Sequence, residues 1–211
     1  MSPQLILWDF DGTLADTLPL ALAAYNRLAL EQGFRTVTDP GQARRMTVRE
    51  FLSKHGIPAW RVPGLFSRFL SEMSGSIRSA VLFEGITDAL EALRQDQRRH
   101  IVISSNSTDN IRECLQRQSA DSLFESVLGT SRLSGKERQI RRAIRDFNVA
   151  ADECLYIGDE VRDIEAARAA GVPVGCVAWG LNAAETLQQH APAFLAESPE
   201  QLPALVRALN R

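Results

Sequence analysis

The sequence predicts an α/β fold in which a doubly wound parallel sheet carries an inserted all-helical domain. Three observations lead to this prediction. A short apolar run, Leu5–Trp8, stands near the start, no strand is evident in the long stretch that follows it, and from Gly85 onward short apolar segments alternate with helical ones. Such alternation is typical of parallel sheets with right-handed crossovers. We therefore expect a core domain at 1–15 and 84–211, and a helical domain at 16–83.

The first strand is expected at Leu5–Trp8, which is too short for a helix and too apolar for a surface strand. Asp9 and Asp11 follow at the point where this strand ends. The carboxyl edge of an open α/β sheet is where ligands bind, and Gly12 allows a sharp turn beside a ligand. Two carboxylates this close together are costly unless a cation lies between them. We take this cation to be Mg²⁺.

Three helices are expected in the inserted stretch. Apolar residues recur at helical spacing from Leu18 to Ala29, and Gly33 follows as a C-terminal cap. A second helix is expected over Gln42–His55 and a third over Val62–Ile77, where apolar side chains form a continuous stripe. An insertion of this size is too large for a simple crossover, so we expect it to pack on itself.

The rest of the chain alternates between the two element types. Short apolar segments that stop at glycine or small polar residues predict five further strands: His100–Ser105, Phe124–Gly129, Cys154–Ile157, Val174–Ala178 and an edge strand at Phe194–Leu195. Amphipathic segments predict six helices: Ile86–Gln95, Ser107–Arg117, Lys136–Phe147, Glu160–Ala170, Ala183–Gln189 and Gln201–Leu209. Because helices separate the strands, we expect the strands to be parallel.

The composition is that of an ordinary soluble globular protein, with 45% hydrophobic and 24% charged residues. A net charge of −2 gives no sign of a nucleic acid partner or a membrane surface. No apolar stretch is long enough to span a membrane, and the start of the chain lacks the pattern of a signal peptide. We therefore expect a cytoplasmic protein that is a monomer or a homodimer.

The cysteines and histidines give no metal-binding pattern. Cys114, Cys154 and Cys176 are odd in number and widely spaced, which argues against a disulfide framework and a zinc site. We expect them to be reduced packing residues. The three histidines are also scattered, and we expect them at the surface or at helix ends: His55, His100 and His190.

Polar groups gather after the predicted strands, where an apolar sheet has no use for them: Asp9 with Asp11, Ser105 with Asn106, Lys136, and Asp159 with Asp163. Ser105 and Asn106 are expected to open a helix whose free N–H groups attract an anion. Lys136 lies on the helix stripe that faces the sheet, where a cation needs an anionic partner. Together, these groups predict a site for magnesium and phosphate.

Each of these residues alone also fits a structural role. Acidic residues at strand ends often cap the next helix, and Ser105 fits an N-cap equally well. Lys136 could extend past its helix to water, and Asp163 could be a solvated helix residue. Because four separate coincidences would be needed, their occurrence in this order favours a shared site.

The segments that carry these residues resemble the haloacid dehalogenase superfamily, in particular its phosphoglycolate phosphatase-like members with a C1-type helical cap. Four segments are similar to the four motifs of that superfamily, in order: Asp9–Leu14, Ser105 with Asn106, Lys136, and Gly158–Asp163. The resemblance covers nearly the whole chain. It implies a Rossmann-like core and a Mg²⁺-dependent phosphatase that acts on a small phosphorylated metabolite.

The resemblance also implies a role for each residue. Asp9 would attack phosphorus to form an aspartyl-phosphate, and Asp11 would protonate the leaving group and then activate water. Mg²⁺ would be held by Asp9, the backbone carbonyl of Asp11 and Asp159. Asp163 and Thr13 would orient these groups by contacting them, without binding the metal ion directly. The remaining groups would hold the phosphoryl oxygens: Ser105, Asn106 and Lys136.

Substrate contacts and the reaction type stay open. Three basic residues of the helical domain are candidate contacts to a substrate carboxylate or second phosphate, although a solvated helix face accounts for them equally well: Arg44, Arg45 and Lys54. A sugar-phosphate mutase of the same superfamily would share every core residue. A non-catalytic phospho-ligand-binding protein on the same fold would be expected to have lost a catalytic residue.

Overall fold

The computed structural model describes residues 3–46, 48–77, 79–129 and 135–209. A six-stranded sheet forms its centre, with the order β3-β2-β1-β4-β5-β6 and every strand pair parallel. The strands are β1 (Leu5–Trp8), β2 (Arg99–Ser104), β3 (Ser126–Gly129), β4 (Cys154–Gly158), β5 (Val174–Val177) and β6 (Leu195–Ala196). The chain first winds outward from β1 to β3 and then returns to β4. The crevice at this change of direction is where such sheets bind ligands.

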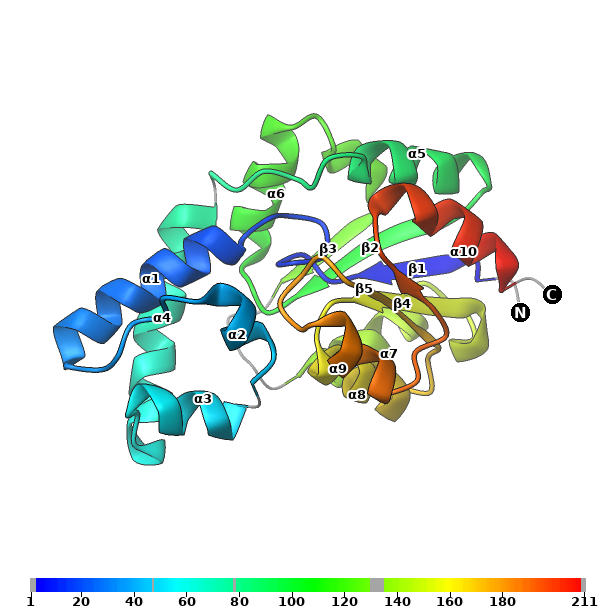
Figure 1. The fold of residues 1–211 in the computed structure, drawn as a ribbon. Helices are drawn as coiled ribbons and strands as arrows, with labels where there is room; N and C mark the ends of the chain where they lie inside the picture. Colours follow the sequence, from blue (N-terminus) through cyan, green and yellow to red (C-terminus); the bar gives the residue numbers. More distant parts are fainter. Residues whose placement is uncertain (1–2, 47, 78, 130–134, 210–211) are drawn as a thin grey trace.

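Helices cover both faces of the sheet (Figure 1). Along β1 the side chains alternate, so that Ile6 and Trp8 belong to one apolar core and Leu5 and Leu7 to the other. The first core is covered by α5 (Ile86–Gln95), α6 (Thr108–Arg117) and α10 (Leu202–Ala208). The second is covered by α7 (Lys136–Asp146), α8 (Val161–Ala169) and α9 (Ala184–Gln189). The doubly wound α/β prediction is therefore confirmed.

The inserted stretch lies beyond the carboxyl end of β1 (Figure 1). Its helices in the described residues are α1 (Leu18–Gln32), α2 (Pro40–Arg44), α3 (Val48–His55) and α4 (Val62–Ile77). Helices α1 and α4 pack against each other, and α1 ends at Gly33 with a φ of 73°. Short 3-10 turns occur here and in the core: Ala59–Arg61, Asp121–Leu123, Ala151–Glu153 and Pro199–Gln201.

The single helix predicted over Gln42–His55 is wrong, because two helices occupy this stretch. Helix α2 begins earlier, at Pro40, and the Asp39 side chain accepts a hydrogen bond from the Gln42 N–H at 3.0 Å. An aspartate followed by proline is a helix start that apolar spacing alone does not reveal. Helix α2 already ends at Arg44, before α3 begins.

The cysteines and two of the histidines lie as expected. All three cysteines are free and buried, which agrees with a packing role. His55 ends α3 and His190 follows the last residue of α9. Among the helices of the described residues, none combines the length and apolar character needed to cross a bilayer.

His100 contradicts the expectation of a surface or helix-end position. It lies within β2, is 1% exposed, and its Nδ1 accepts a hydrogen bond from Trp8 Nε1 at 3.0 Å. Burial lowers the pKa of His100 to about 4, because the charged imidazolium would lose its hydration. The neutral imidazole is therefore part of the apolar core.

Acid is expected to destabilise the fold through His100. Between pH 6.5 and about 4 the unfolded chain binds a proton that the folded chain does not, so stability falls as the pH is lowered through this window. At pH 5 this group should cost about 2 kcal/mol of unfolding free energy. His100→Asn keeps an acceptor near Trp8 and does not titrate. We expect its urea-unfolding midpoint to fall less between pH 7 and pH 5 than that of the native chain, and equal falls would contradict the assignment.

Candidate active site

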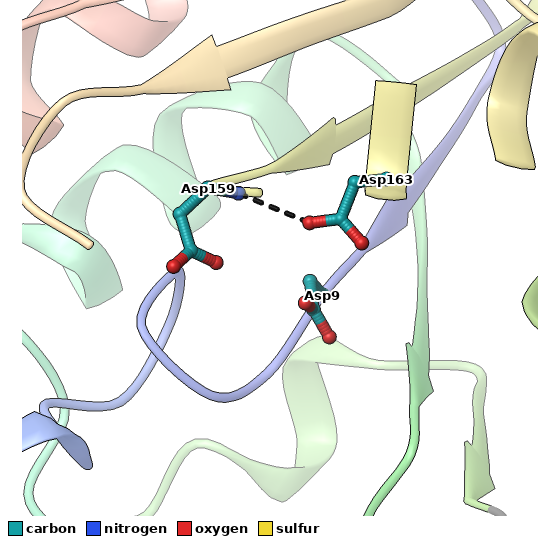
Figure 2. A group of neighbouring side chains, drawn as sticks. All are labelled: Asp9, Asp159 and Asp163. Atoms are coloured by element: carbon teal, nitrogen blue, oxygen red, sulfur yellow. Dashed lines mark hydrogen bonds between the residues drawn. The ribbon is translucent and has the colours of Figure 1, made fainter. Parts of the chain in front are cut away.

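Three aspartates from different elements meet at the carboxyl edge of the sheet (Figure 2). Asp9 follows β1, Asp159 follows β4, and Asp163 lies in the first turn of α8. All three are buried, and one carboxylate oxygen from each lies within 4.8 Å of the others. They converge because β1 and β4 are adjacent parallel strands, with Trp8 paired to Ile157. Residues far apart in the chain thus form one acidic cluster.

Hydrogen bonds fix the orientation of this cluster. The Thr13 hydroxyl donates to Asp159 Oδ1 at 2.8 Å, and the Leu181 N–H donates to Asp159 Oδ2 at 2.6 Å. The Asp159 N–H in turn donates to Asp163 Oδ2 at 3.2 Å, the dashed line in Figure 2. Thr13 therefore lies where a residue that orients Asp159 would have to lie.

Lys136 provides a cation for the cluster. Its Nζ lies 2.9 Å from Asp9 Oδ2 and also forms an ion pair with Asp163. The lysine side chain is only 10% exposed, so it does not extend past its helix to water. One lysine facing three carboxylates leaves excess negative charge. Three hard oxygen donors with such an excess suit a divalent cation such as Mg²⁺.

The acidic cluster is electrostatically unfavourable with Lys136 as its cation. Burial raises the pKa of Asp9 to about 7, although the charge of Lys136 acts to lower it. Burial also raises the pKa of Asp159 well above its ordinary value, and the neighbouring Glu160 adds to this rise. A further cation would favour the ionised carboxylates that these shifts disfavour. The donor set and its electrostatics therefore fit a bound metal ion.

The Asp11 carboxyl makes a different set of contacts. Its Oδ2 accepts a hydrogen bond from Ser104 Oγ at 3.3 Å and lies 3.5 Å from Asn106 Nδ2. Its Oδ1 is buried and has no hydrogen-bond partner among the described residues. Burial raises the pKa of Asp11, which favours the protonated form. A carboxyl of this kind can exchange a proton with a bound ligand.

A cavity of about 200 Å³ lies beside Asp11. Ser105 and Asn106 line it as well, at the end of β2. Both precede α6, which begins at Thr108 and is capped by the Ser107 hydroxyl, so the expectation that Ser105 opens or caps this helix is wrong. The wall toward the helical stretch is apolar and includes Leu18, Ala21, Phe66, Phe69, Leu70 and Met73.

The sequence profile of haloacid dehalogenase-like hydrolases matches residues 6–177, a range that holds every residue of the site described above except Leu181. The chain belongs to this family. The family resemblance inferred from the four motifs is thereby confirmed, and the chain is a haloacid dehalogenase-like hydrolase.

Relatives of this haloacid dehalogenase-like hydrolase span almost its whole length. A phosphoglycolate phosphatase from Synechococcus elongatus is 33% identical over 99% of this chain and 99% of its own. A pyrophosphatase, PpaX, from Listeria monocytogenes is 30% identical over 96% of this chain and 95% of its own. Among solved structures, a haloacid dehalogenase-like hydrolase from Streptococcus pneumoniae aligns with a TM-score of 0.81 at 21% identity, covering 96% of this chain and 97% of its own. This last likeness supports the fold.

The three basic residues suggested as substrate contacts do not line the cavity of this hydrolase. Arg44 instead donates hydrogen bonds to the carbonyl oxygens of Ala178 at 2.9 Å and Leu181 at 3.3 Å. These bonds tie α2 to the loop after β5. Lys54 is hydrogen-bonded within the helical stretch, and Arg45 is exposed.

Sequence reasoning missed two charged residues that do line the cavity, Glu160 and Arg162. Glu160 is the N-cap residue of α8, Arg162 lies in its first turn, and the two side chains form an ion pair. The sequence did indicate their position, because both residues lie between Asp159 and Asp163, which were expected at the site. Since these two aspartates are about one helical turn apart and meet at one site, the residues between them also stay close to it.

Two glycines allow the backbone to approach Asp159 closely. A Cβ atom on Gly12 would collide with a carboxylate oxygen of Asp159, and a Cβ on Gly180 would collide with the same side chain. Gly12 also has a φ of 78°, in the left-handed region that favours glycine. The Asp159 carboxylate therefore lies in a space that only glycine leaves open.

Proposed function

We propose that this chain is a Mg²⁺-dependent phosphatase that hydrolyses a small phosphomonoester through an aspartyl-phosphate on Asp9. The observation that carries the proposal is that Lys136 pairs with Asp9 inside a buried acidic cluster, while the Asp11 carboxyl lies on the adjacent cavity. Membership of a hydrolase family and the phosphatase names of the relatives support it. Phosphoglycolate is a candidate substrate because the cyanobacterial relative is named for it.

Asp9, Asp159 and the backbone carbonyl of Asp11 would hold the Mg²⁺ ion. Asp163 would keep Asp159 and Lys136 in place, since it accepts from the first and pairs with the second. When bound, the ion would offset negative charge, so that an anionic nucleophile can approach an anionic phosphate.

The reaction would proceed in two displacements. The Asp9 carboxylate attacks phosphorus, a bond forms between its oxygen and phosphorus, and the bond from phosphorus to the leaving oxygen breaks. Asp11 gives its proton to the leaving oxygen, a role that its raised pKa and unpartnered Oδ1 support. Asp11 then takes a proton from a water molecule that attacks the same phosphorus. The bond from phosphorus to the Asp9 oxygen breaks, which frees the carboxylate and releases inorganic phosphate.

Neutral and cationic donors would hold the phosphoryl oxygens during both displacements. Ser105 and Asn106 line the cavity beside Asp11, and Lys136 approaches from the side of Asp9. Donors placed where charge develops stabilise the transition state more than the bound substrate.

We further propose that residues 16–83 act as a cap domain over a core formed by 1–15 and 84–211. Helices α1 and α4 supply the apolar wall of the cavity, which supports this division. A cap of this kind would limit the access of bulk water while the aspartyl-phosphate forms.

Phosphate release from a panel of phosphomonoesters tests the proposal. The panel contains phosphoglycolate, sugar phosphates and alkyl phosphates, with pyrophosphate alongside, each assayed with Mg²⁺ and with a chelator. We expect release from at least one phosphomonoester that needs Mg²⁺ and stops on chelation. Release that is indifferent to the chelator would contradict the metal assignment. Conversion of a sugar phosphate to its isomer without phosphate release would indicate a mutase instead.

A further inference from the structure

Arg162 stands out among the residues that the proposed mechanism leaves without a role. It lies in the first turn of α8, lines the cavity, and pairs with Glu160 through one terminal nitrogen. Its Nε is buried and has no hydrogen-bond partner among the described residues. The side chain as a whole is 37% exposed, so a ligand in the cavity can reach its terminal N–H groups, whereas the buried Nε is out of reach.

Few charged residues line the cavity among those that the structure describes. Among the described residues that line it, Arg162 is the sole cation, and the acidic groups are Asp11 and Glu160. The helices of the inserted stretch contribute apolar side chains, as on Phe66 and Met73, in place of the basic contacts expected from the sequence. Among the described lining residues, Arg162 is therefore the one that would attract a second anionic group on a substrate.

Arg162 and Lys136 differ in their relation to the cavity. Lys136 pairs with Asp9 and Asp163 and is not part of the cavity lining. Arg162 lines the cavity, yet its charge still acts to lower the pKa of Asp9. This division leaves Lys136 for the transferred phosphoryl group and Arg162 for the part of the substrate that departs.

We propose that Arg162 determines specificity by binding a carboxylate on the leaving group of the substrate. The inference rests on the proposed phosphatase function and narrows its substrate to phosphomonoesters with a carboxylate close to the phosphate. Glu160 pairs with one terminal nitrogen of the guanidinium, and the exposed terminal N–H groups donate to the carboxylate. A guanidinium that keeps its charge and offers several N–H donors suits this task better than an ammonium group.

Two substrates that differ in a single substituent test the proposal. Phosphoglycolate carries a carboxylate where ethyl phosphate carries a methyl group. For Arg162→Gln we expect kcat/KM on phosphoglycolate to fall about ten- to a hundredfold, chiefly through KM, and on ethyl phosphate by less than about threefold. For Arg162→Lys we expect a kcat/KM on phosphoglycolate between those of the native chain and Arg162→Gln. Arg142→Gln is the matched control, because Arg142 is also paired with an acid, Asp146, but lies exposed on α7.

Several results would overturn the inference. Equal losses on both substrates, or weaker inhibition of Arg162→Gln by inorganic phosphate, would assign Arg162 to the phosphoryl group. No loss on either substrate, or a native chain that prefers ethyl phosphate, would show that Arg162 does not recognise the substrate.

If the native chain releases no phosphate, the proposed function fails separately. The role of Arg162 can then still be decided by calorimetry, which measures the affinity of Asp9→Asn for phosphoglycolate with and without the additional change Arg162→Gln. The inference requires that Arg162→Gln lower this affinity at least about tenfold.

Discussion

Asp9→Asn is expected to abolish phosphate release, with a loss of at least about ten-thousandfold. The amide lacks the anionic oxygen that would attack phosphorus, and no neighbouring carboxylate takes over. Asp163 is engaged by Lys136 and by the Asp159 N–H, and Asp159 is held by Thr13 and Leu181. The variant should still fold, because asparagine has nearly the same volume and removes a carboxylate whose pKa burial has raised.

Phosphate release and thermal unfolding should be measured together for Asp9→Asn. The matched control is Asp16→Asn, since Asp16 follows in the same segment but does not line the cavity. Acid quenching of the native enzyme with labelled substrate should trap label on the protein, and Asp9→Asn should trap none. Appreciable turnover in a folded Asp9→Asn variant would rule out Asp9 as the nucleophile.

Lys136→Met is expected to have the second largest effect, on both rate and stability. The rate should fall about a hundred- to a thousandfold, because a donor to the phosphoryl oxygens is lost. The change also leaves the buried carboxylates of Asp9 and Asp163 without their shared cation. Removing one partner from a buried ion pair costs about 3–5 kcal/mol. Methionine preserves most of the volume, so the cost is mainly electrostatic.

The stability loss of Lys136→Met should depend on the metal. With a chelator present, the carboxylates repel one another and the urea midpoint should fall clearly below that of the native chain. With Mg²⁺ present, the ion would restore positive charge and the difference should shrink. Arg142→Met provides the control, because it removes a cation from the exposed side of the same helix. A stability loss that Mg²⁺ does not reduce would contradict a metal in this cluster.

The fold was predictable because its core elements have unambiguous local signals. A run such as Leu5–Trp8 is apolar at every position, as both faces of a central parallel strand require, and it becomes β1. Prediction failed where a polar capping residue, and not the spacing of apolar residues, determined where a helix begins. Asp39 starts α2 before the expected position. Helix α6 begins within one residue of its expected start, but its cap is Ser107 and not Ser105. His100 was expected at the surface or at a helix end although it also began a predicted strand, and its place in that strand, β2, buries it.

The candidate site was predictable to the extent that strand ends define it. Parallel strands bring their carboxyl ends together, so polar residues after β1 and β4 had to converge. Lys136 could be placed because a lysine on an apolar helix stripe needs a partner, and Asp9 and Asp163 are those partners. The position of Arg44 could not be predicted, because its acceptors are backbone carbonyls of a distant loop. Every residue has a backbone carbonyl, so the residue types do not indicate which of them accept a hydrogen bond.

The close approach of backbone to Asp159 makes the site less tolerant of mutation than its reactive groups alone indicate. Gly12 and Gly180 take no part in the chemistry, yet a single added methyl group at either position would meet the Asp159 side chain. A random substitution there should thus resemble the loss of Asp159 itself, although every acidic residue remains in the sequence. Homologues that keep all the aspartates but lack one of these glycines should accordingly be examined for lost metal affinity before they are counted as active enzymes.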